Sequence, residues 1–254
     1  MQDTINIDVI RQIAREAGKE ILRIYNDSDF SQVVDFKDDN SPLTLADKAS
    51  HQVIVKALNE AYPNIPIISE EGSDVPYDQR KEWSCFWLVD PLDGTKEFIK
   101  RNGEFTVNIA LIKEGNPVMG VVYTPVTDEL YEGSVGYYAR KIQHGDISDL
   151  QVNKKDGNRI AVRSKSHPSK EEEQILNDYN VVDSISVGSS LKFCMLAEGK
   201  ADIYYRHGPT MEWDTAAGQA VLEAAGGAVY KNTGDEIFTY NKESLLNGSF
   251  LCLG

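Results

Sequence analysis

The sequence predicts an α+β fold in which a lobe built on an antiparallel sheet is followed by a smaller α/β lobe. Two changes of pattern along the chain lead to this prediction. Residues 105–139 show β-type patterning and carry hairpin signals, whereas the residues after 158 alternate between short apolar strands and helices. We therefore expect a first lobe over residues 1–155 and a second over residues 156–254, layered into one body.

The chain begins with two predicted helices and a short strand. Residues 27–40 are polar and turn-rich, so we interpret them as a mobile loop, and residues 72–82 as a surface loop. A second helix is expected over residues 45–58, followed by strands at 65–69 and 86–89. The first helix rests on apolar residues that recur at three- and four-residue steps, namely Ile10, Ile13, Ala14, Ala17, Ile21 and Ile24.

The two lobes are expected to differ in how their strands are connected. Strands at 106–112 and 118–123 flank Glu114-Gly115-Asn116-Pro117, a hairpin signal, and a second turn is expected near Thr127-Asp128. Gly226-Gly227 ends the last predicted helix. After residue 158 we expect strands at 160–163, 181–187, 202–206, 228–230 and 250–253 and helices at 169–177, 189–198 and 215–225.

Charge and composition exclude several classes of function. The 254 residues carry a formal charge of −14, with 41% hydrophobic and 26% charged residues, which is typical of a globular protein. Such an acidic chain is repelled by nucleic acids and by anionic membranes, and no basic stripe compensates for this. A small phosphorylated substrate would also be repelled unless bound divalent cations reversed the field locally.

The cysteines and the terminus indicate the cytoplasm. Cys85, Cys194 and Cys252 are widely spaced and lack a CxxC pattern, which argues against a disulfide framework or a zinc site. We expect no integral membrane segment, because no apolar run is long enough, and the first residues do not resemble a signal peptide. Peripheral contact with the inner face of the cell membrane stays open, although no residue requires it.

The segment 87–95 carries the strongest chemical signal. An apolar run ends in two carboxylates, Asp90 and Asp93, and Pro91 and Gly94 favour a sharp turn there. Both carboxylates and the carbonyl of Leu92 can then face one point, where only a cation would make them stable. These hard oxygen ligands suit Mg²⁺. The alternative is ordinary turn chemistry, in which Asp bonds to local backbone amides.

Three further acidic segments have both a chemical and a structural interpretation. Glu70 and Glu71 follow a short strand, so they lie either at the carboxyl edge of a sheet or in a solvated loop. Asp47 opens the second helix, where it either completes a capping box with Thr44 or orients a water. Asp214 opens the last helix as a cap or as a ligand.

A second group of residues suggests a phosphate cradle. Gly188-Ser189-Ser190-Leu191-Lys192 lies where a strand is expected to lead into a helix, so free amides, hydroxyls and a lysine meet there. The alternative is a capped helix with a surface lysine. Arg206 ends the next strand and His167 lies in a loop; each by itself is more often a surface residue.

Three motifs together resemble the inositol monophosphatase superfamily: Glu70-Glu71, Asp90-Pro91-Leu92-Asp93-Gly94-Thr95 and Trp213-Asp214-Thr215-Ala216-Ala217-Gly218. The resemblance spans nearly the whole chain. It implies a layered α-β-α-β-α sandwich of the carbohydrate-phosphatase type and a Mg²⁺-dependent, lithium-sensitive phosphomonoesterase. Within the superfamily, residues 93–99 and 188–193 most resemble the CysQ-type bisphosphate nucleotidases of sulfur metabolism. Those enzymes remove the 3′-phosphate from adenosine 3′,5′-bisphosphate.

The resemblance also implies residue roles. Two to three Mg²⁺ ions would be held by Glu70, Asp90, the carbonyl of Leu92, Asp93 and Asp214. Asp47 and Thr95 would orient and deprotonate the attacking water, and Glu71 matches a neighbouring acidic position. Ser190 and His167 match the substrate side less closely. The expected substrate contacts are Glu70, Leu92, Asp93, Gly94, Thr95, Ser189, Lys192, Arg206 and Asp214.

The expected reaction is in-line attack of a metal-activated water on the 3′-phosphorus, which gives AMP and phosphate without a covalent intermediate. Two alternatives stay open, an inositol or sugar monophosphate phosphatase and a non-catalytic regulatory protein that binds metal or nucleotide. The pair Asp47 and Thr95 counts against the second, because a structural ion needs no water-activating residues. The expected partner is a small nucleotide bisphosphate, and the chain is either a monomer or a homodimer.

Overall fold

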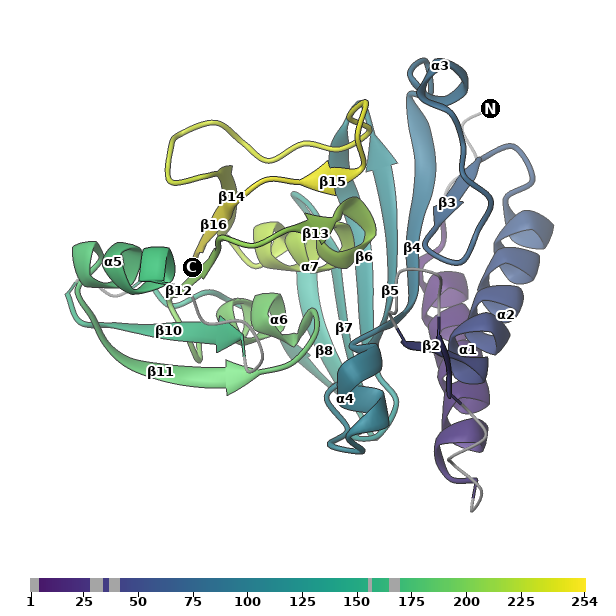
Figure 1. Cartoon of the computed structure of the whole chain (residues 1–254), viewed down its shortest axis with the longest axis horizontal. Helices are drawn as coiled ribbons and strands as arrows, with labels where there is room; N and C mark the ends of the chain where they lie inside the picture. Colours follow the sequence, from purple (N-terminus) through teal and green to yellow (C-terminus); the bar gives the residue numbers. More distant parts are fainter. Residues whose placement is uncertain (1–4, 28–33, 37–41, 155–156, 165–169) are drawn as a thin grey trace.

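The computed structural model describes residues 5–27, 34–36, 42–154, 157–164 and 170–254. It has five layers (Figure 1). The outer helices α1 (Ile7–Tyr25) and α2 (Leu45–Ala61) cover one face of a seven-stranded sheet. The helices α6 (Leu191–Ala197) and α7 (Glu212–Ala224) lie between that sheet and a five-stranded sheet. The helix α5 (Lys170–Asp178) covers the far face of the smaller sheet, so the predicted α-β-α-β-α sandwich is confirmed.

The larger sheet is antiparallel except at one edge. Its strands run in the order of the sequence, and only β3 and β4 pair in parallel. Between β5 and β6, Glu114 and Gly115 have positive φ and form a two-residue turn, so the predicted hairpin is present but Asn116 and Pro117, expected in the turn, belong to β6. The strands are β3 (Ile67–Ser69), β4 (Cys85–Asp93), β5 (Thr106–Lys113), β6 (Asn116–Thr124), β7 (Glu129–Ser134), β8 (Tyr138–Gln143) and β9 (Asp146–Asp149).

The smaller sheet mixes parallel and antiparallel pairs in the order β11-β10-β12-β16-β14. Its parallel strands alternate with helices in the chain, as the sequence predicted for this part. Two further pairs of short strands, β1 with β2 and β13 with β15, lie outside both sheets. The remaining strands are β1 (Val34–Phe36), β2 (Pro42–Thr44), β10 (Arg159–Ser164), β11 (Val181–Val187), β12 (Ile203–Arg206), β13 (Thr210–Met211), β14 (Ala228–Lys231), β15 (Leu246–Asn247) and β16 (Phe250–Leu253).

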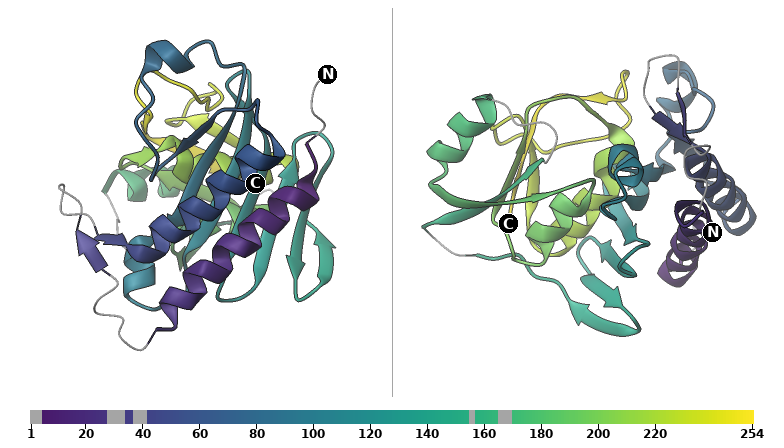
Figure 2. Two further views of the ribbon diagram at one scale, coloured as in Figure 1. Left: turned by 90° about the vertical axis from the view of Figure 1, so that its right-hand side faces the viewer. Right: turned by 60° about the horizontal axis from the view of Figure 1, so that its bottom comes forward.

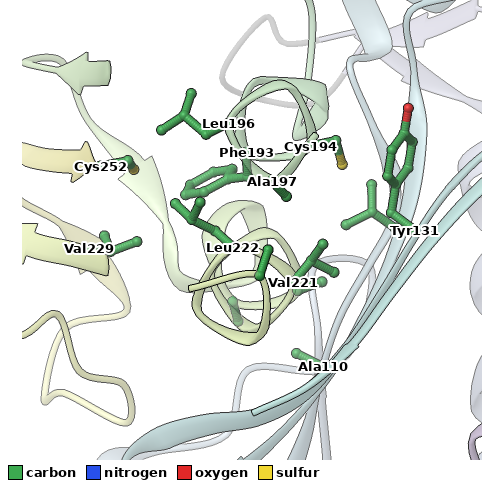
Figure 3. Close-up of a cluster of buried hydrophobic side chains, with 14 of the residues drawn as sticks. Ala110, Tyr131, Phe193, Cys194, Leu196, Ala197, Val221, Leu222, Val229 and Cys252 are labelled. Atoms are coloured by element: carbon green, nitrogen blue, oxygen red, sulfur yellow. The ribbon is translucent and has the colours of Figure 1, made fainter. Parts of the chain in front are cut away.

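The helix α7 is packed from both sides. Figure 3 shows side chains of α6 and α7 filling the space between the two sheets. Towards the larger sheet, a Cβ at Gly120 would lie 2.4 Å from the carbonyl oxygen of Ala217 in α7. Towards α6, a Cβ at Gly218 would lie 2.5 Å from the Phe193 ring. Glycines therefore bring the central helix close to its neighbours, and α1 and α2 lie side by side over the opposite face of the larger sheet (Figure 2).

Four sequence expectations need correction. The loop predicted at 72–82 contains a short helix, α3 (Tyr77–Arg80). The strand predicted to end at residue 89 continues as β4 through Pro91 to Asp93. Residues 144–158, a polar stretch for which the sequence predicts no strand or helix, contain β9, and residues 27–40, predicted as a mobile loop, contain β1. Residues 28–33 and 37–40 of that segment lie outside the described residues.

Arg80 of α3 ties the segment after β3 to the C-terminal part of the chain. Its guanidinium is almost fully buried and donates to the side chain of Asn241 at 2.8 Å and to the carbonyls of Lys242 at 2.6 Å and Glu243 at 2.8 Å. The buried carboxylate of Glu212, the first residue of α7, accepts from the backbone N–H groups of Asn241 and Lys242. The start of α7 is thereby linked to α3 through residues 241–243.

Cys85, Cys194 and Cys252 are free thiols in the structure. Among the described residues, no helix is both long and apolar enough to span a bilayer.

Candidate active site

The Asp-Pro-Leu-Asp motif lies in a bulge of β4. Asp90 pairs with Asn108 of β5 and Asp93 pairs with Thr106, so Pro91 and Leu92 stand opposite the single residue Val107. Pro91 has no N–H to donate, which the bulge tolerates. Gly94 follows with φ +93°, a conformation that favours glycine, and the short helix α4 (Thr95–Ile99) begins directly after it.

Asp90 is held rigidly inside the molecule. It is 1% exposed, and its Oδ1 accepts the backbone N–H of Leu92 at 3.1 Å. Ser50 of α2 donates to the carbonyl of Pro91 at 2.7 Å, which ties the bulge to that helix. Burial raises the pKa of Asp90 well above its usual range, and the negative charges of Glu70, Asp93, Asp214 and Asp47 raise it further. The five carboxylates predicted from separate motifs therefore belong to one electrostatic cluster.

Asp93 and Asp214 approach one another from different layers. Asp93 Oδ2 accepts from the Ser190 hydroxyl at 2.8 Å and lies 3.4 Å from Nδ2 of Asn108. Asp214 lies in the first turn of α7, where its Oδ2 accepts the backbone N–H of Met211 at 2.8 Å. Burial raises the pKa of Asp214, and the charge of Asp93 raises it further. Met211 is the N-cap of α7, so Asp214 takes part in capping as the third residue of a capping box and is not the N-cap itself, and its role as a metal ligand stays a prediction.

Glu70 and Asp47 enter the cluster from its other side. Glu70 follows β3, and its N–H donates to the carbonyl of Val89 in β4 at 3.1 Å. Asp47 lies in the first turn of α2 and is 2% exposed. Glu71 is the next residue after Glu70 and lies near His51 of α2, whose Nδ1 is 2.9 Å from the Ser69 hydroxyl. Two strand ends and two helix starts thus deliver the acidic side chains.

A cavity adjoins Asp93 and Asp214 between the two sheets, and its walls carry three cations, Lys96, Lys192 and Arg206. Lys192 is buried, donates to the carbonyl of Ser189 at 2.5 Å, and lies 5.6 Å from the centre of the Tyr204 ring. Burial lowers the pKa of this lysine, and the charges of Asp93, Glu97 and Asp214 oppose that effect. Arg206 donates to the carbonyl of Gly208 at 3.2 Å.

Ser189, on the wall of the same cavity, has a φ of +45°, which is uncommon for a residue with a side chain. Its hydroxyl oxygen is buried and has no hydrogen-bond partner in the described part of the chain. The preceding Gly188 leaves no room for a side chain, since a Cβ there would lie 2.8 Å from the carbonyl oxygen of Glu104. Strained backbone and an unused hydroxyl at a cavity wall are typical of a ligand site.

Two predicted residues are less well placed by the structure. Thr95 is the first residue of α4 and is half-buried, and its predicted action with Asp47 on the attacking water stays a prediction. His167 lies outside the described residues. Sequence reasoning missed Ser50 and Asn108, which support the motif from behind. The available signal for Asn108 was a single amide side chain within the otherwise apolar run 107–112.

The donor set suits a hard divalent cation. Carboxylate and backbone carbonyl oxygens are the ligands that Mg²⁺ prefers, and a cation would relieve the repulsion that raises the pKa of Asp90. Among the residues that the structure describes, no three acidic, cysteine or histidine side chains are already grouped to ligate one ion. The residues fit a divalent ion by their chemistry.

Comparison with known proteins identifies the family. The chain matches the inositol monophosphatase family over residues 3–251. This protein belongs to the inositol monophosphatase family. It is 47% identical to the 3′(2′),5′-bisphosphate nucleotidase CysQ of Escherichia coli over 246 residues, which cover 96% of this chain and 98% of that protein. It is 34% identical to the enzyme of the same name from Haemophilus influenzae over 259 residues, or 99% and 94% of the two chains.

Solved structures of family members share the fold. The crystal structure of CysQ from Bacteroides thetaiotaomicron has a TM-score of 0.85 at 46% identity and covers 97% of this chain and 96% of its own. The inositol monophosphatase from Anabaena has a TM-score of 0.73 at 26% identity, with coverage of 97% and 89%. The resemblance read from the motifs is thus confirmed, and the chain is an enzyme of a divalent-metal-dependent phosphatase family.

Proposed function

We propose that this protein is a 3′(2′),5′-bisphosphate nucleotidase that converts adenosine 3′,5′-bisphosphate to AMP and phosphate. The observation that supports this substrate is the cavity beside the acidic cluster. One side of the cavity carries Asp93 and Asp214, and its other walls carry Lys192 and Arg206. A substrate with two phosphates needs both features: metal-binding carboxylates at the phosphate that leaves and cationic side chains at the phosphate that stays.

We infer that Glu70, Asp90, the carbonyl of Leu92, Asp93 and Asp214 hold two to three Mg²⁺ ions and that Li⁺ inhibits the enzyme. When bound, Mg²⁺ supplies charge neutralisation at the phosphoryl oxygens and lowers the pKa of an attacking water. Each of the three central aspartates has one oxygen engaged by a donor of the chain. No hydrogen bond from any described residue reaches their other oxygens, which therefore supply the ligand atoms.

Asp47 and Thr95 are the proposed residues for the proton of the attacking water. Asp47 lies in the first turn of α2, where the positive end of the helix dipole favours its ionised form. Thr95 follows Gly94 at the start of α4, on the other side of the bulge. A threonine hydroxyl can accept a proton from water and donate its own to a carboxylate, so the pair moves one proton away from the water.

The substrate side is assigned to the cavity walls. The hydroxyl of Ser189 and the charges of Lys192 and Arg206 would bind the 5′-phosphate, and Gly94 allows the substrate close to the backbone. Glu70, Leu92, Asp93, Thr95 and Asp214 would contact the 3′-phosphate. Ser190 is assigned to Asp93, to which its hydroxyl donates a hydrogen bond. The roles of Glu71 and His167 stay predictions.

The test is phosphate release by the purified protein with four substrates: adenosine 3′,5′-bisphosphate, its sulfated form, inositol monophosphate and fructose bisphosphate. We expect the nucleotide bisphosphate to give the largest kcat/KM, EDTA to abolish turnover, and Mg²⁺ to restore it. Preference for inositol monophosphate would instead make the protein a simple monophosphatase. Nucleotide and metal binding without phosphate release would contradict an enzymatic role for the site.

The place of action is the cytoplasm in this proposal. Three free cysteines suit a reducing compartment.

A further inference from the structure

A buried chain of polar groups lies behind the carboxylates and joins three layers of the fold. Thr106 Oγ1 in β5 donates to Oδ1 of Asn108 at 3.0 Å. Nδ2 of Asn108 donates to the hydroxyl of Ser190 at 2.9 Å and lies 3.4 Å from Asp93 Oδ2. The Ser190 hydroxyl lies 2.8 Å both from Asp93 Oδ2 and from the backbone carbonyl of Asp214. Thr106, Asn108 and Ser190 are each at most 1% exposed.

The direction of these hydrogen bonds follows from the donors available. The Thr106 proton points to Oδ1 of Asn108, so the amide NH₂ faces Ser190 and Asp93. Because Ser190 accepts a proton from Asn108, its own single proton goes to Asp93 or to the carbonyl of Asp214. Each donor in this series of hydrogen bonds is an uncharged group. The series therefore holds Asp93 in place without adding another charge to the acidic cluster, whose members already repel one another.

The side-chain amide of Asn108 is unfavourable in free energy at its buried position in the strand. It lies in the middle of β5 between Val107 and Ile109, both of them fully buried. A buried amide costs free energy unless its hydrogen bonds are satisfied, and an aliphatic residue would fill this strand position without that cost. The polar chain ends at Asp93 and Asp214, two proposed metal ligands that come from different layers.

We propose that Asn108 is a positioning residue for the metal site. Together with Ser190 it holds Asp93 Oδ2, so that Oδ1 of Asp93 stays directed to the ion. Through the same serine it links Asp93, at the end of β4, to the first turn of α7, which carries Asp214. The two ligands are thereby set in a fixed relation before any ion binds. This role rests on the proposed function.

The test compares Mg²⁺ binding with catalysis in four variants: Asn108→Leu, Ser190→Ala, the double variant, and Asn116→Leu as the matched control. Asn116 is the exposed first residue of β6, and its side-chain amide donates to the nearby carbonyl of Glu114 and to no other described residue. Mg²⁺ affinity is measured by calorimetry without substrate, kcat and KM with adenosine 3′,5′-bisphosphate, and folding by thermal unfolding in EDTA.

We expect Asn108→Leu to weaken Mg²⁺ binding roughly 10-fold or more, as loss of a group supporting a metal ligand does. The affinity loss of the double variant should be smaller than the sum of the single losses, because both residues act on the same oxygen. At saturating Mg²⁺, kcat should fall more than KM rises. The Asn116→Leu control should match the wild type in all three measurements.

Wild-type Mg²⁺ affinity in folded Asn108→Leu, or additive losses in the double variant, would overturn the positioning role. Should Asn108→Leu not fold, Ser190→Ala decides, since it removes the donor nearest to Asp93 Oδ2 with the loss of one oxygen atom. A wild-type protein that neither binds Mg²⁺ nor releases phosphate would refute the proposed function instead, and this outcome is separate from the other two.

Discussion

Asp90 shows how strongly a single residue of this site depends on its surroundings. It is the most deeply buried of the clustered carboxylates, and four neighbouring acidic groups add to the effect of burial on its pKa. Without a cation, ionised Asp90 therefore opposes folding. Residues that serve binding or catalysis at the expense of stability are expected at an active site.

Replacing Asp90 tests directly whether this residue serves the site at the expense of stability. Asp90→Asn keeps the shape of the side chain and removes its charge. We expect kcat to fall by more than the roughly 10–100-fold typical of changes one step removed from a metal. In EDTA at neutral pH, the same variant should unfold at a higher temperature than the wild type. An effect of about 1 kcal/mol would shift the midpoint by roughly 2–4 °C in a chain of this size. Near-normal turnover would contradict the assignment of Asp90.

The pH dependence in EDTA provides the control. The folded-state pKa values of Asp90 and Asp214 lie above the ordinary value of 3.8, so above that pH these two groups hold more protons in the folded protein than in the unfolded chain. The free energy of unfolding should then decrease as pH rises from 3.8 through the raised pKa values. Asp90→Asn should reduce this slope, and saturating Mg²⁺ should reverse it. An unchanged slope in the variant would show that Asp90 is not the group that titrates.

Lys192 and Arg206 should decide substrate preference. Replacing both by Met removes two charges from the cavity wall while keeping much of the side-chain volume. Since hydrogen bonds to charged groups contribute about 1.5–3 kcal/mol each, KM for adenosine 3′,5′-bisphosphate should rise roughly 100-fold or more. KM for a simple monophosphate should change far less, and Lys200→Met, an exposed lysine beyond α6, should change neither. Equal effects on both substrates would favour a monophosphatase.

Among the elements, α7 is the most constrained by its neighbours. It is packed against the larger sheet through Gly120 and Gly133 and against α6 through Gly218. Such close approach leaves no space for additional atoms, because folded interiors are as dense as organic crystals. The position of Asp214 depends on this packing.

Gly218→Ala should therefore be destabilising although alanine favours helices. Its Cβ would lie 2.5 and 2.6 Å from two carbons of the Phe193 ring, so α6 or α7 must shift. We expect a loss of about 1–3 kcal/mol, measured by urea unfolding. Gly248→Ala is the matched control, since nothing lies within 4 Å of the added atom. A Gly218→Ala protein as stable as the wild type would mean that α6 can shift at little cost in free energy.

The sequence predicted the long elements better than the short ones. The amphipathic period identified α1, and the hairpin signal Glu114-Gly115-Asn116-Pro117 identified the turn between β5 and β6, although only its first two residues form that turn. The prediction ended β4 too early because proline is unfavourable inside a strand, and only the register of β5 reveals the bulge that accommodates Pro91. The two-residue strands β13 and β15 exist only as each other's partners, so no local pattern marks them.

At the scale of the whole molecule, the acidic cluster was predictable because its members lie at the ends of strands and helices. The hydrogen bonds that support the cluster from behind were not predictable from the sequence. Asn108 reads as part of an apolar strand, and its hydrogen bond to Ser190 joins residues 82 positions apart. Sequence spacing holds no information about contacts of that range, which arise only when two sheets enclose one helical layer. The division into two lobes at residues 155 and 156 stays a prediction.

The buried hydrogen bonds of Arg80 lead to a prediction about the stability of the whole molecule. Arg80→Met would leave the carbonyls of Lys242 and Glu243 and the amide of Asn241 without their buried donor. We expect a stability loss of at least about 2 kcal/mol in urea unfolding, because unsatisfied buried acceptors cost about 1–3 kcal/mol each. Arg23→Met, which removes an exposed i,i+3 ion pair on α1, should cost less than about 1 kcal/mol. Equal losses would show that the Arg80 contacts add nothing.

The central position of α7 also bears on biosynthesis. The larger sheet is complete once residue 149 has been made, yet the helix that covers its inner face starts only at residue 212. While a ribosome adds the intervening residues, an apolar surface meant for the interior faces water, and exposed surfaces of that kind attract chaperones or other nascent chains. Chains that terminate early, before α7 is made, should therefore be recovered as aggregates.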